Sequence, residues 1–211
     1  MKTWRGTILA AGAAPHGREA LLLEESLAKA DISVACDRAM EGFEYIVGDG
    51  DGLTKEQKNL LGDKYVHIAE QDTNDLAKAY RFITEKITAR PLEITVFGAT
   101  GGRIDHELGN IFHLADFEKE DVHVEMVCEG GTLIGICGSR RIATYAGADV
   151  SVFAPESATK IKSRGLKWPL DDVNLDKLWS GTLNKATTDE IELESNKNII
   201  VYISRKAEGN G

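Results

Sequence analysis

Three short polar clusters in the first half of the chain carry the side-chain types that phosphate and metal chemistry require. They are GDGDG at 48–52, QDTND at 71–75 and GATGGRIDH at 98–106. Each lies just beyond a short apolar run typical of a strand, and at or before a stretch with helical period. In open parallel sheets the carboxyl ends of the strands form the crevice in which ligands bind. We therefore expect three separate loops to meet at one edge of one sheet.

The first cluster holds two carboxylates, Asp49 and Asp51, between glycines. In an extended segment two residues separated by one position face the same side, and the glycines let a bulky ligand approach the backbone. Hard oxygen ligands of this kind suit Mg²⁺, which commonly takes one or two protein carboxylates together with substrate phosphates. The alternative is a glycine-rich turn with solvated aspartates, which is the commoner origin of Asp-Gly-Asp-Gly when it stands alone.

The second cluster is expected to begin a helix near Asn74. Asp72 or Thr73 can cap that helix, and Asp75 falls in its first turn, where the helix dipole favours negative charge. This structural explanation accounts for Asp72 and Asp75 without any ligand. It does not account for Gln71, which leaves a binding role open.

The third cluster predicts a phosphate site. Gly101 and Gly102 followed by Arg103 lead directly into a helix, so free backbone N–H groups and a bidentate guanidinium converge on one point. Further polar side chains follow on the first two turns of that helix, with the last two on one face: Asp105, His106 and Asn110. The alternative is a plain loop with a favourable N-terminal charge and an ordinary surface histidine, but the string is uncommon.

Taken together, the clusters supply Mg²⁺ ligands and a phosphate cradle in one crevice, which is the equipment of a nucleotide phosphotransferase. The sequence has no Walker lysine loop and no kinase-type glycine-rich loop. Transfer would therefore depend on a metal held by carboxylates.

Composition limits the partners and the compartment. The 211 residues include 34 acidic and 25 basic side chains, a net charge of −9, with 42% hydrophobic and 28% charged residues. These values are ordinary for a globular protein, and the acidic balance argues against binding to nucleic acid. No apolar run approaches the ~20 residues that cross a bilayer, so no membrane partner is expected. Three cysteines without a Cys-x-x-Cys pair indicate a reduced, cytoplasmic chain.

The order of apolar runs and helical stretches predicts two domains. The first is an α/β domain whose mostly parallel sheet is flanked by helices, because its strand candidates are β-branched runs without strict alternation. Its strands are expected at 7–11, 32–36, 45–48, 65–69 and 94–99, and its helices at 19–30, 55–62, 74–87 and 104–117. The second is an all-β sandwich, because short alternating strands follow at 122–127, 132–138, 140–147, 149–154, 158–163 and 198–205. We place the domains at 1–119 and 120–211, with a disordered tail at 207–211.

Five segments, in order, resemble the signatures of the thiamine pyrophosphokinase family. They are IVGDGDGL at 46–53, QDTNDLAKAYRF at 71–82, VFGATGGRIDHELGNI at 96–111, SRGLKWPL at 163–170 and ESNK at 194–197. The resemblance covers nearly the whole chain. It implies an ATP-binding catalytic domain, a β-sandwich domain that binds thiamine and dimerises, and a homodimer with thiamine near the junction. The implied reaction is attack of thiamine's hydroxyl on the β-phosphorus of ATP, giving thiamine diphosphate and AMP.

The resemblance also implies roles for particular residues. The catalytic set comprises Asp49, Asp51, Asp72, Asp75, Arg103 and Asp105, of which Asp49, Asp51 and Asp75 would hold Mg²⁺. The ATP crevice adds Asp37, Gln71, Thr73, Gly101, Gly102, His106 and Asn110, and the thiamine pocket comprises Gln71, Asp72, Trp168, Ser195 and Asn196. An aromatic face such as Trp168 suits a cationic thiazolium ring. Three carboxylates stay open as acceptor of the hydroxyl proton: Asp72, Asp75 and Asp105.

The first loop and the position after the aspartate pair depart from the family pattern. The family's first loop usually reads Ala-Asp-Gly-Gly-Ala-Asn, whereas this chain has Cys36-Asp37-Arg38-Ala39-Met40, and Gly52 stands where serine is usual. These changes concern the nucleotide contacts more than the reaction. Two other functions stay open: a non-catalytic nucleotide or thiamine sensor, and a pyrophosphokinase for another small alcohol such as a pterin.

Overall fold

The structure is a computed structural model that describes residues 2–37, 42–171 and 173–206. The expected contacts of Arg38, Ala39 and Met40, and the expected disorder of 207–211, lie outside the described residues. The chain divides into two compact units. Unit 1 comprises Met1–His113 and Met126–Cys128, and unit 2 comprises Leu114–Glu125 and Glu129–Gly211.

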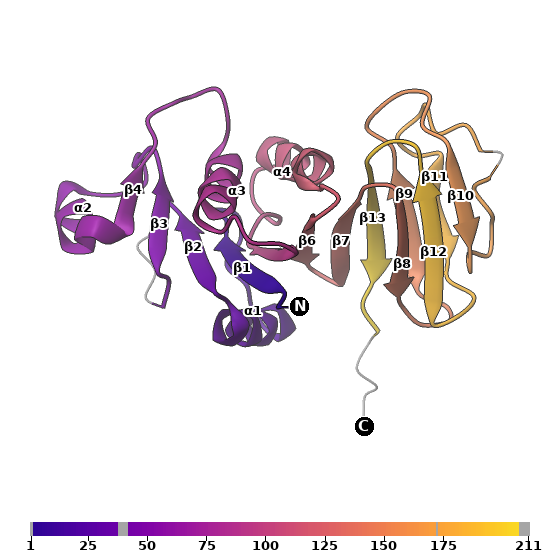
Figure 1. Cartoon of the computed structure of the whole chain (residues 1–211), viewed down its shortest axis with the longest axis horizontal. Coiled ribbons are helices and arrows are strands. Elements are labelled where there is room, and N and C mark those ends of the chain that lie inside the picture. Colours follow the sequence, from indigo (N-terminus) through magenta and orange to yellow (C-terminus); the bar gives the residue numbers. More distant parts are fainter. Residues whose placement is uncertain (1, 38–41, 172, 207–211) are drawn as a thin grey trace. The chain divides into compact units, whose positions relative to one another are not determined.

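Unit 1 is built on five parallel strands. Their order is β5-β1-β2-β3-β4, and every neighbouring pair is parallel (Figure 1). Side chains at their centres, such as Ile8, Val34 and Val96, are fully buried, which is why these segments have no polar face in the sequence. The expected parallel sheet is confirmed. The bounds are Trp4–Leu9 for β1, Ile32–Cys36 for β2, Tyr45–Gly48 for β3, Tyr65–His67 for β4 and Leu92–Phe97 for β5.

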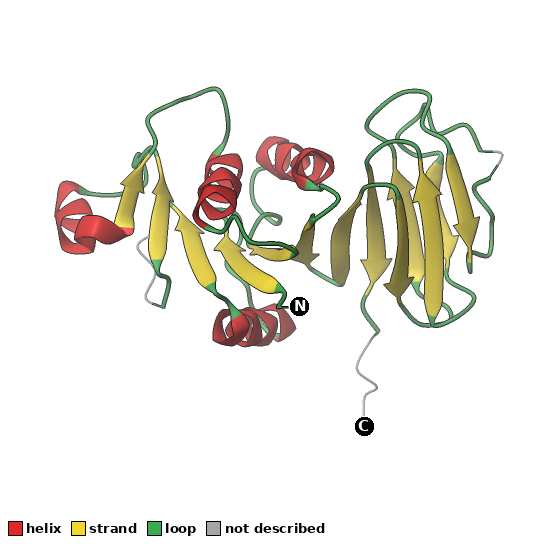
Figure 2. Ribbon diagram, viewed as in Figure 1, coloured by secondary structure: helices red, strands yellow, loops and turns green. Residues whose placement is uncertain are grey.

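Helices flank this sheet. Helix α1 packs against β1 and β5, and α3 packs against β1, β2 and β3 on the opposite face (Figure 2). Helix α2 begins with a capping box in which Thr54 and Gln57 satisfy each other's backbone N–H. The bounds are Arg18–Lys29 for α1, Lys55–Leu61 for α2, Gly62–Lys64 for the 3₁₀ turn η1, Asp75–Lys86 for α3 and Ile104–Phe117 for α4.

Unit 2 is a sandwich of antiparallel strands. One sheet contains the order β11-β9-β13-β7, and the other has the order β10-β12-β8. Their inner faces share one apolar core, to which Val150 and Val201 contribute from the first sheet and Ile191 from the second. Strand β6, Val122–Cys128, begins in unit 2, and its last residues, Met126–Cys128, belong to unit 1. The bounds of the other strands are Gly131–Ile136 for β7, Ser139–Ala143 for β8, Asp149–Phe153 for β9, Ile161–Arg164 for β10, Gly181–Lys185 for β11, Glu190–Ser195 for β12 and Ile199–Ser204 for β13. The expected sandwich is confirmed.

Two strands of unit 2 are missing from the expectations. In β12 the residues Ile191, Leu193 and Ser195 are buried while alternate glutamates face outward, so its period of two carried a usable signal. Strand β11 gave little signal, because its register shifts between Gly181 and Asn184 and Leu183 has a φ of 61°. An irregular strand shows no clean alternation.

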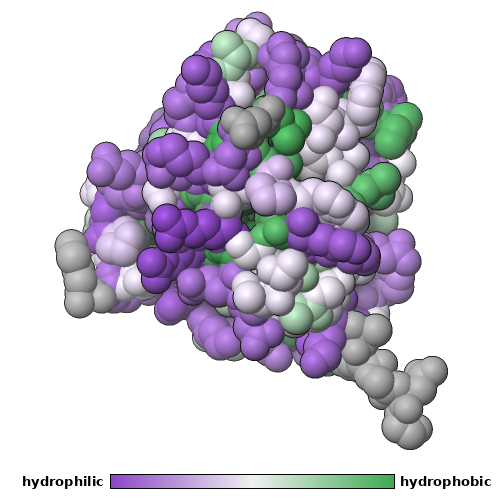
Figure 3. Space-filling model, turned by 90° about the vertical axis from the view of Figure 1, so that its right-hand side faces the viewer, coloured by the Kyte–Doolittle hydropathy of each residue, from purple (hydrophilic) through white to green (hydrophobic). Residues whose placement is uncertain are grey.

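The face of the molecule that carries unit 2 is mostly hydrophilic. Hydrophilic side chains cover most of the face that carries unit 2, with apolar groups standing apart from one another (Figure 3). Within the described residues, no helix is both long and apolar enough to cross a membrane.

Candidate active site

A cavity of about 450 Å³ opens in unit 1 at the carboxyl ends of its strands. Its lining draws on the end of β2, on the segments that follow β1, β3, β4 and β5, and on the first turns of α3 and α4, as the crevice rule for parallel sheets predicts. Gly12, after β1, lies directly against the segment after β5, since a Cβ at this position would come within 2.5 Å of the Gly98 carbonyl oxygen. The lining includes Gly12, Cys36, Asp49, Gln71, Asp75 and Arg103.

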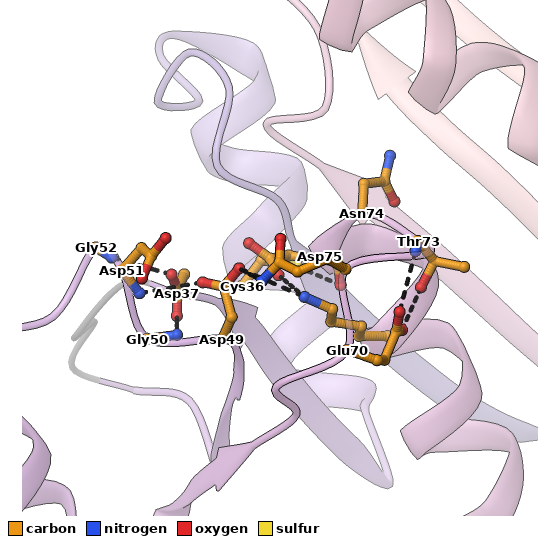
Figure 4. Close-up of polar contacts among 12 residues, drawn as sticks. Cys36, Asp37, Asp49, Gly50, Asp51, Gly52, Glu70, Thr73, Asn74 and Asp75 are labelled. Carbon is orange, nitrogen blue, oxygen red and sulfur yellow. Dashed lines mark hydrogen bonds and ion pairs between the residues drawn. The ribbon is translucent and has the colours of Figure 1, made fainter.

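Three carboxylates gather at this edge from three different elements. Asp37 follows β2, Asp49 follows β3 and Asp75 begins α3, and one oxygen of each lies within 4.8 Å of the others (Figure 4). Gly48 makes the approach possible, because a Cβ there would lie 2.4 Å from Oδ1 of Asp37. We call Asp37, Asp49 and Asp75 the carboxylate group.

Backbone N–H groups hold the first of these carboxylates. Gly50 donates to Oδ1 of Asp37 at 2.9 Å and Gly52 donates to Oδ2 at 3.1 Å. The pKa of Asp37 is raised, chiefly by burial and then by the negative charges of Asp75 and Asp49. A nearby cation would relieve this repulsion.

Asp49 is held in its ionised form. Oδ1 accepts from the N–H of Asp51 at 3.1 Å, and Oδ2 accepts from Nε2 of Gln71 at 3.0 Å. These two hydrogen bonds lower the pKa of Asp49 to about 2. Gln71, which helix capping could not explain in the sequence, therefore orients a carboxylate of the group.

Asp51 lies outside the carboxylate group. The sequence predicted an extended segment that places Asp49 and Asp51 on one side, but β3 ends at Gly48 and 50–53 form a turn, with a φ of 82° at Gly50. The turn leaves the Asp51 side chain exposed. The expected common face for Asp49 and Asp51 is therefore wrong, because it assumed that the strand continues through the glycines.

Lys78, for which the sequence predicts no role, is buried beside the carboxylate group. Its side chain is 1% exposed, and Nζ lies 3.1 Å from Oδ1 of Asp75 and 3.7 Å from Oδ2 of Asp49. Burial by itself lowers the pKa of Lys78, but the hydrogen bond and charge of Asp75 and the charge of Asp49 outweigh it and raise the pKa. The i,i+3 spacing from Asp75 on a helix was the available signal.

The loop before α3 is organised by Glu70. Its carboxylate accepts from the N–H groups of Asp72 and Thr73 at 2.7 and 3.1 Å and from the Thr73 hydroxyl at 2.5 Å, and it pairs with Arg81. The hydrogen bonds from Thr73 and Arg81 lower the pKa of Glu70 to about 2.

The expectation that Asp72 or Thr73 caps the helix is wrong. Asn74 is the cap, because α3 begins at Asp75 and the Asn74 side chain accepts from the N–H of Ala77, whereas the Thr73 hydroxyl is bonded to Glu70.

We expect Glu70→Gln to lower kcat/KM for phosphoryl transfer about fivefold. An amide cannot accept all the hydrogen bonds that the Glu70 carboxylate accepts, so the segment that carries Gln71 and Thr73 loosens. Steady-state kinetics would measure this. Glu85→Gln, an exposed change on α3, is the matched control and should behave like the parent. Equal kinetics for both variants would show that the loop holds its position without Glu70.

The segment after β5 presents Arg103 to the cavity. Its guanidinium is 75% exposed and binds Asp105 through two hydrogen bonds, of 3.2 and 2.6 Å. Each partner stabilises the charge of the other, so the pKa of Arg103 is raised and that of Asp105 is lowered. One of the N–H groups expected to be free, that of Gly101, donates to Glu107 at 3.2 Å. The cavity lining includes Gly102, Arg103, His106 and Asn110.

The remaining expected residues belong to unit 2. Trp168 is 50% exposed and lines a second, smaller cavity of about 180 Å³. Its backbone is held by Asn184, which accepts from its N–H at 3.1 Å and donates to its carbonyl at 2.6 Å. Ser195 is buried and Asn196 accepts from the N–H of Lys160 at 2.8 Å. Neither of these two residues is part of the lining of that cavity.

Comparisons with known proteins assign the chain to a family. The family model described as thiamin pyrophosphokinase, catalytic domain, matches residues 23–126. The model described as thiamin pyrophosphokinase, substrate-binding domain, matches residues 131–202. The chain belongs to the thiamin pyrophosphokinase family. The two matches follow one another along the chain in the order in which the sequence signatures occur.

Individual relatives agree with the family. The chain is 28% identical over 189 residues to Thiamine pyrophosphokinase 1 of Oryza sativa subsp. japonica, a match that covers 75% of this chain and 65% of that protein. It is 27% identical over 168 residues to Thiamin pyrophosphokinase 1 of Caenorhabditis elegans, covering 75% and 68%. The chain thus spans less than two thirds of the length of the rice relative.

Solved thiamin pyrophosphokinases share the fold. The structure from Candida albicans superposes with a TM-score of 0.72 at 16% identity and covers 97% of this chain and 93% of that one. The structure from Bacillus subtilis has a TM-score of 0.70 at 20% identity and covers 97% and 100%. At such identities the likeness concerns the fold.

Proposed function

We propose that this chain transfers pyrophosphate from ATP to the primary hydroxyl of thiamine, giving thiamine diphosphate and AMP. The observation that carries the proposal is the cavity of unit 1, whose lining combines members of the carboxylate group, buried Lys78 and Arg103 in a chain of the thiamin pyrophosphokinase family. The sensor and pterin alternatives are not favoured, because the relatives are named thiamine pyrophosphokinases.

The carboxylate group suits a divalent cation. Three carboxylates and one lysine leave a formal charge of −3 + 1 = −2, which Mg²⁺ would balance, and their oxygens come from separate elements as hard ligands. Asp37, Asp49 and Asp75 would hold the ion, and Asp51, a ligand expected from the sequence, remains a further candidate. Bound there, Mg²⁺ would neutralise phosphate charge and polarise the phosphoryl oxygens.

Arg103 would receive the phosphates from the other wall of the lining. Its planar fork already binds a carboxylate, Asp105, in the geometry with which arginine binds phosphate. An arriving phosphate can take over one of these hydrogen bonds, while the other lets Asp105 keep the guanidinium oriented. Donors that are oriented in advance contribute most to catalysis, because they need no rearrangement as charge develops.

The hydroxyl proton needs little assistance if the transition state is loose, so orientation of the acceptor matters more than a strong base. Of the three candidates from the sequence, Asp75 lines the cavity, and Asp72 and Asp105 are not part of its lining. Asp75 is accordingly our candidate for receiving that proton.

The compartment and the oligomeric state are also part of the proposal. None of the three cysteines, all of which lie in the described part of the chain, forms a disulfide, which suits a reducing, cytoplasmic compartment. A homodimer is expected from the family resemblance, and size-exclusion chromatography with light scattering measures it directly.

The test is turnover of the purified chain with ATP, Mg²⁺ and thiamine, with separation of the products by chromatography. Equal amounts of AMP and thiamine diphosphate are expected, with none when Mg²⁺ is chelated. Release of ADP in place of AMP, or pyrophosphorylation of a pterin alcohol in preference to thiamine, would overturn the proposal.

We expect Trp168→Leu to raise the KM for thiamine about tenfold with little change in kcat or in the KM for ATP. A partly desolvated cation–π contact is worth roughly 1–2 kcal/mol, and leucine keeps the apolar volume without the ring. Trp179→Leu is the matched control, since Trp179 is 69% exposed and is not part of the lining of the cavity at Trp168. An unchanged KM for thiamine in Trp168→Leu would exclude a thiazolium contact at this ring.

A further inference from the structure

Two asparagines of unit 1 form a bridge between the segments that line the cavity. Asn74 Nδ2 donates to Oδ1 of Asn110 at 2.9 Å, and Asn110 Nδ2 donates to the carbonyl of Ala99 at 2.9 Å. At the other end, Oδ1 of Asn74 accepts from the N–H of Ala77 at 3.0 Å. The bridge therefore connects the start of α3, the second turn of α4 and the segment after β5.

The ends of the bridge determine the orientation of both amides. Ala77 N–H can only donate and the Ala99 carbonyl can only accept, so each amide has one arrangement that keeps all three bonds. Turning either amide by 180° places like groups against each other at both of its contacts. Both side chains are partly buried, which makes such a loss more costly than it is at the surface.

The bridge joins the two chemical halves of the cavity. Asn74 directly precedes Asp75, a member of the carboxylate group, and Ala99 lies on the segment that continues to Gly102 and Arg103. Asn74, Ala99 and Asn110 all line the cavity themselves. These three hydrogen bonds thus link the cation side of the cavity to its phosphate side.

We propose that the Asn74–Asn110 bridge is a positioning device that lets the carboxylate group and the Arg103 segment hold one Mg²⁺–nucleotide together, so that the ion and ATP strengthen each other's binding. This inference rests on the proposed function, since it names how that site selects the metal-bound form of the nucleotide. Coupling of this kind is a free energy between two ligands, and it is reciprocal.

The test measures ATP binding by calorimetry without thiamine, with and without Mg²⁺, in the parent and in Asn74→Ser, Asn110→Ala and the double variant. Serine is as good a helix cap as asparagine but does not reach Asn110, so Asn74→Ser removes the bridge and keeps α3 capped. We expect each single variant to reduce the Mg²⁺-dependent gain in ATP affinity about tenfold, the size that follows from loss of the hydrogen bond between the two asparagines, which both variants remove. In the double variant, the Mg²⁺-dependent gain in ATP affinity should fall no further than in either single variant, because each single change already breaks the bridge.

The control variant is Ser26→Ala, which removes the partly buried contact of 2.7 Å between Ser26 and Thr7 elsewhere in unit 1. It should lower thermal stability without changing the Mg²⁺-dependent gain. The inference is overturned if the bridge variants lower stability but keep the parent's gain, or if their losses multiply in the double variant. Failure of the parent to bind ATP with Mg²⁺ at all would instead refute the proposed function, so the two failures are distinguishable.

Discussion

Asp75→Asn is expected to lower kcat/KM by roughly a thousandfold or more while unit 1 stays folded. The amide has the shape of the carboxylate, but it changes the formal charge of the carboxylate group with Lys78 from −2 to −1 and removes an oxygen that lies within 4.8 Å of the other two. Helix α3 keeps its cap, because Asn74 and not Asp75 accepts from Ala77. The loss of favourable charge in the first turn costs about 0.3–1 kcal/mol. The ion pair with buried Lys78 is also lost, but Lys78 keeps Asp49 as a charged partner at 3.7 Å, so the domain is destabilised without unfolding.

Two measurements check this expectation: steady-state formation of AMP, and calorimetric titration of the variant with Mg²⁺ in the presence of ATP. Asp49→Asn should behave in the same way, whereas Asp63→Asn, an exposed change in η1, should match the parent. Turnover of Asp75→Asn within tenfold of the parent would mean that the carboxylate group does not hold the catalytic ion.

Asp51→Asn decides between two ligand sets. Retained Mg²⁺ binding is expected if Asp37, Asp49 and Asp75 hold the ion, since the carboxylate of Asp51 lies outside their group. A loss as large as that of Asp75→Asn would favour the set Asp49, Asp51 and Asp75 that the family resemblance implies. Titration of Asp51→Asn with Mg²⁺ in the presence of ATP distinguishes the two ligand sets.

The loops that meet at the cavity could be predicted from the sequence, because strand direction alone decides that loops after parallel strands share one edge. Which atoms touch could not be predicted in the same way. The period-2 rule placed Asp49 and Asp51 on one side, but Gly50 adopts a φ of 82° and turns the chain, and Asp37 approaches through the space that Gly48 leaves. The turn at Gly50 and the approach of Asp37 past Gly48 both depend on glycine. A glycine in the sequence allows such a conformation or approach, but it does not predict it.

Positions where a polar residue is buried were the hardest to predict. A lysine on a helix is normally solvated, so the sequence predicts no role for Lys78, although it stands three residues after Asp75. The sequence places the cap of α3 one or two residues too early, because it does not show that Glu70 binds the Thr73 hydroxyl and leaves Asn74 to accept from Ala77. In both cases the missing information is a tertiary contact.

Lys78→Met is the second large prediction, with a loss of about a hundredfold in kcat/KM and a lower free energy of unfolding without Mg²⁺. Methionine has a similar length but no charge, so three carboxylates would face one another without the ammonium that now lies 3.1 Å from Asp75 and 3.7 Å from Asp49. Removing one partner of a buried ion pair typically costs about 3–5 kcal/mol. Added Mg²⁺ should restore much of that stability, because it supplies positive charge to the same carboxylates, but it should not restore turnover to the same extent.

Thermal unfolding in chelator and in excess Mg²⁺, together with AMP formation, measures both parts of this prediction. Lys86→Met, an exposed change on the same helix, serves as the matched control and should leave the Mg²⁺ dependence of stability unchanged. Lys78→Arg keeps the charge, so it should recover most of the stability but less of the turnover, since the larger fork changes the spacing of Asp49 and Asp75. If Lys78→Met unfolds at the parent's temperature in chelator, the ammonium does not compensate the carboxylates, and the charge balance of −2 that favours a divalent ion at this site is incorrect.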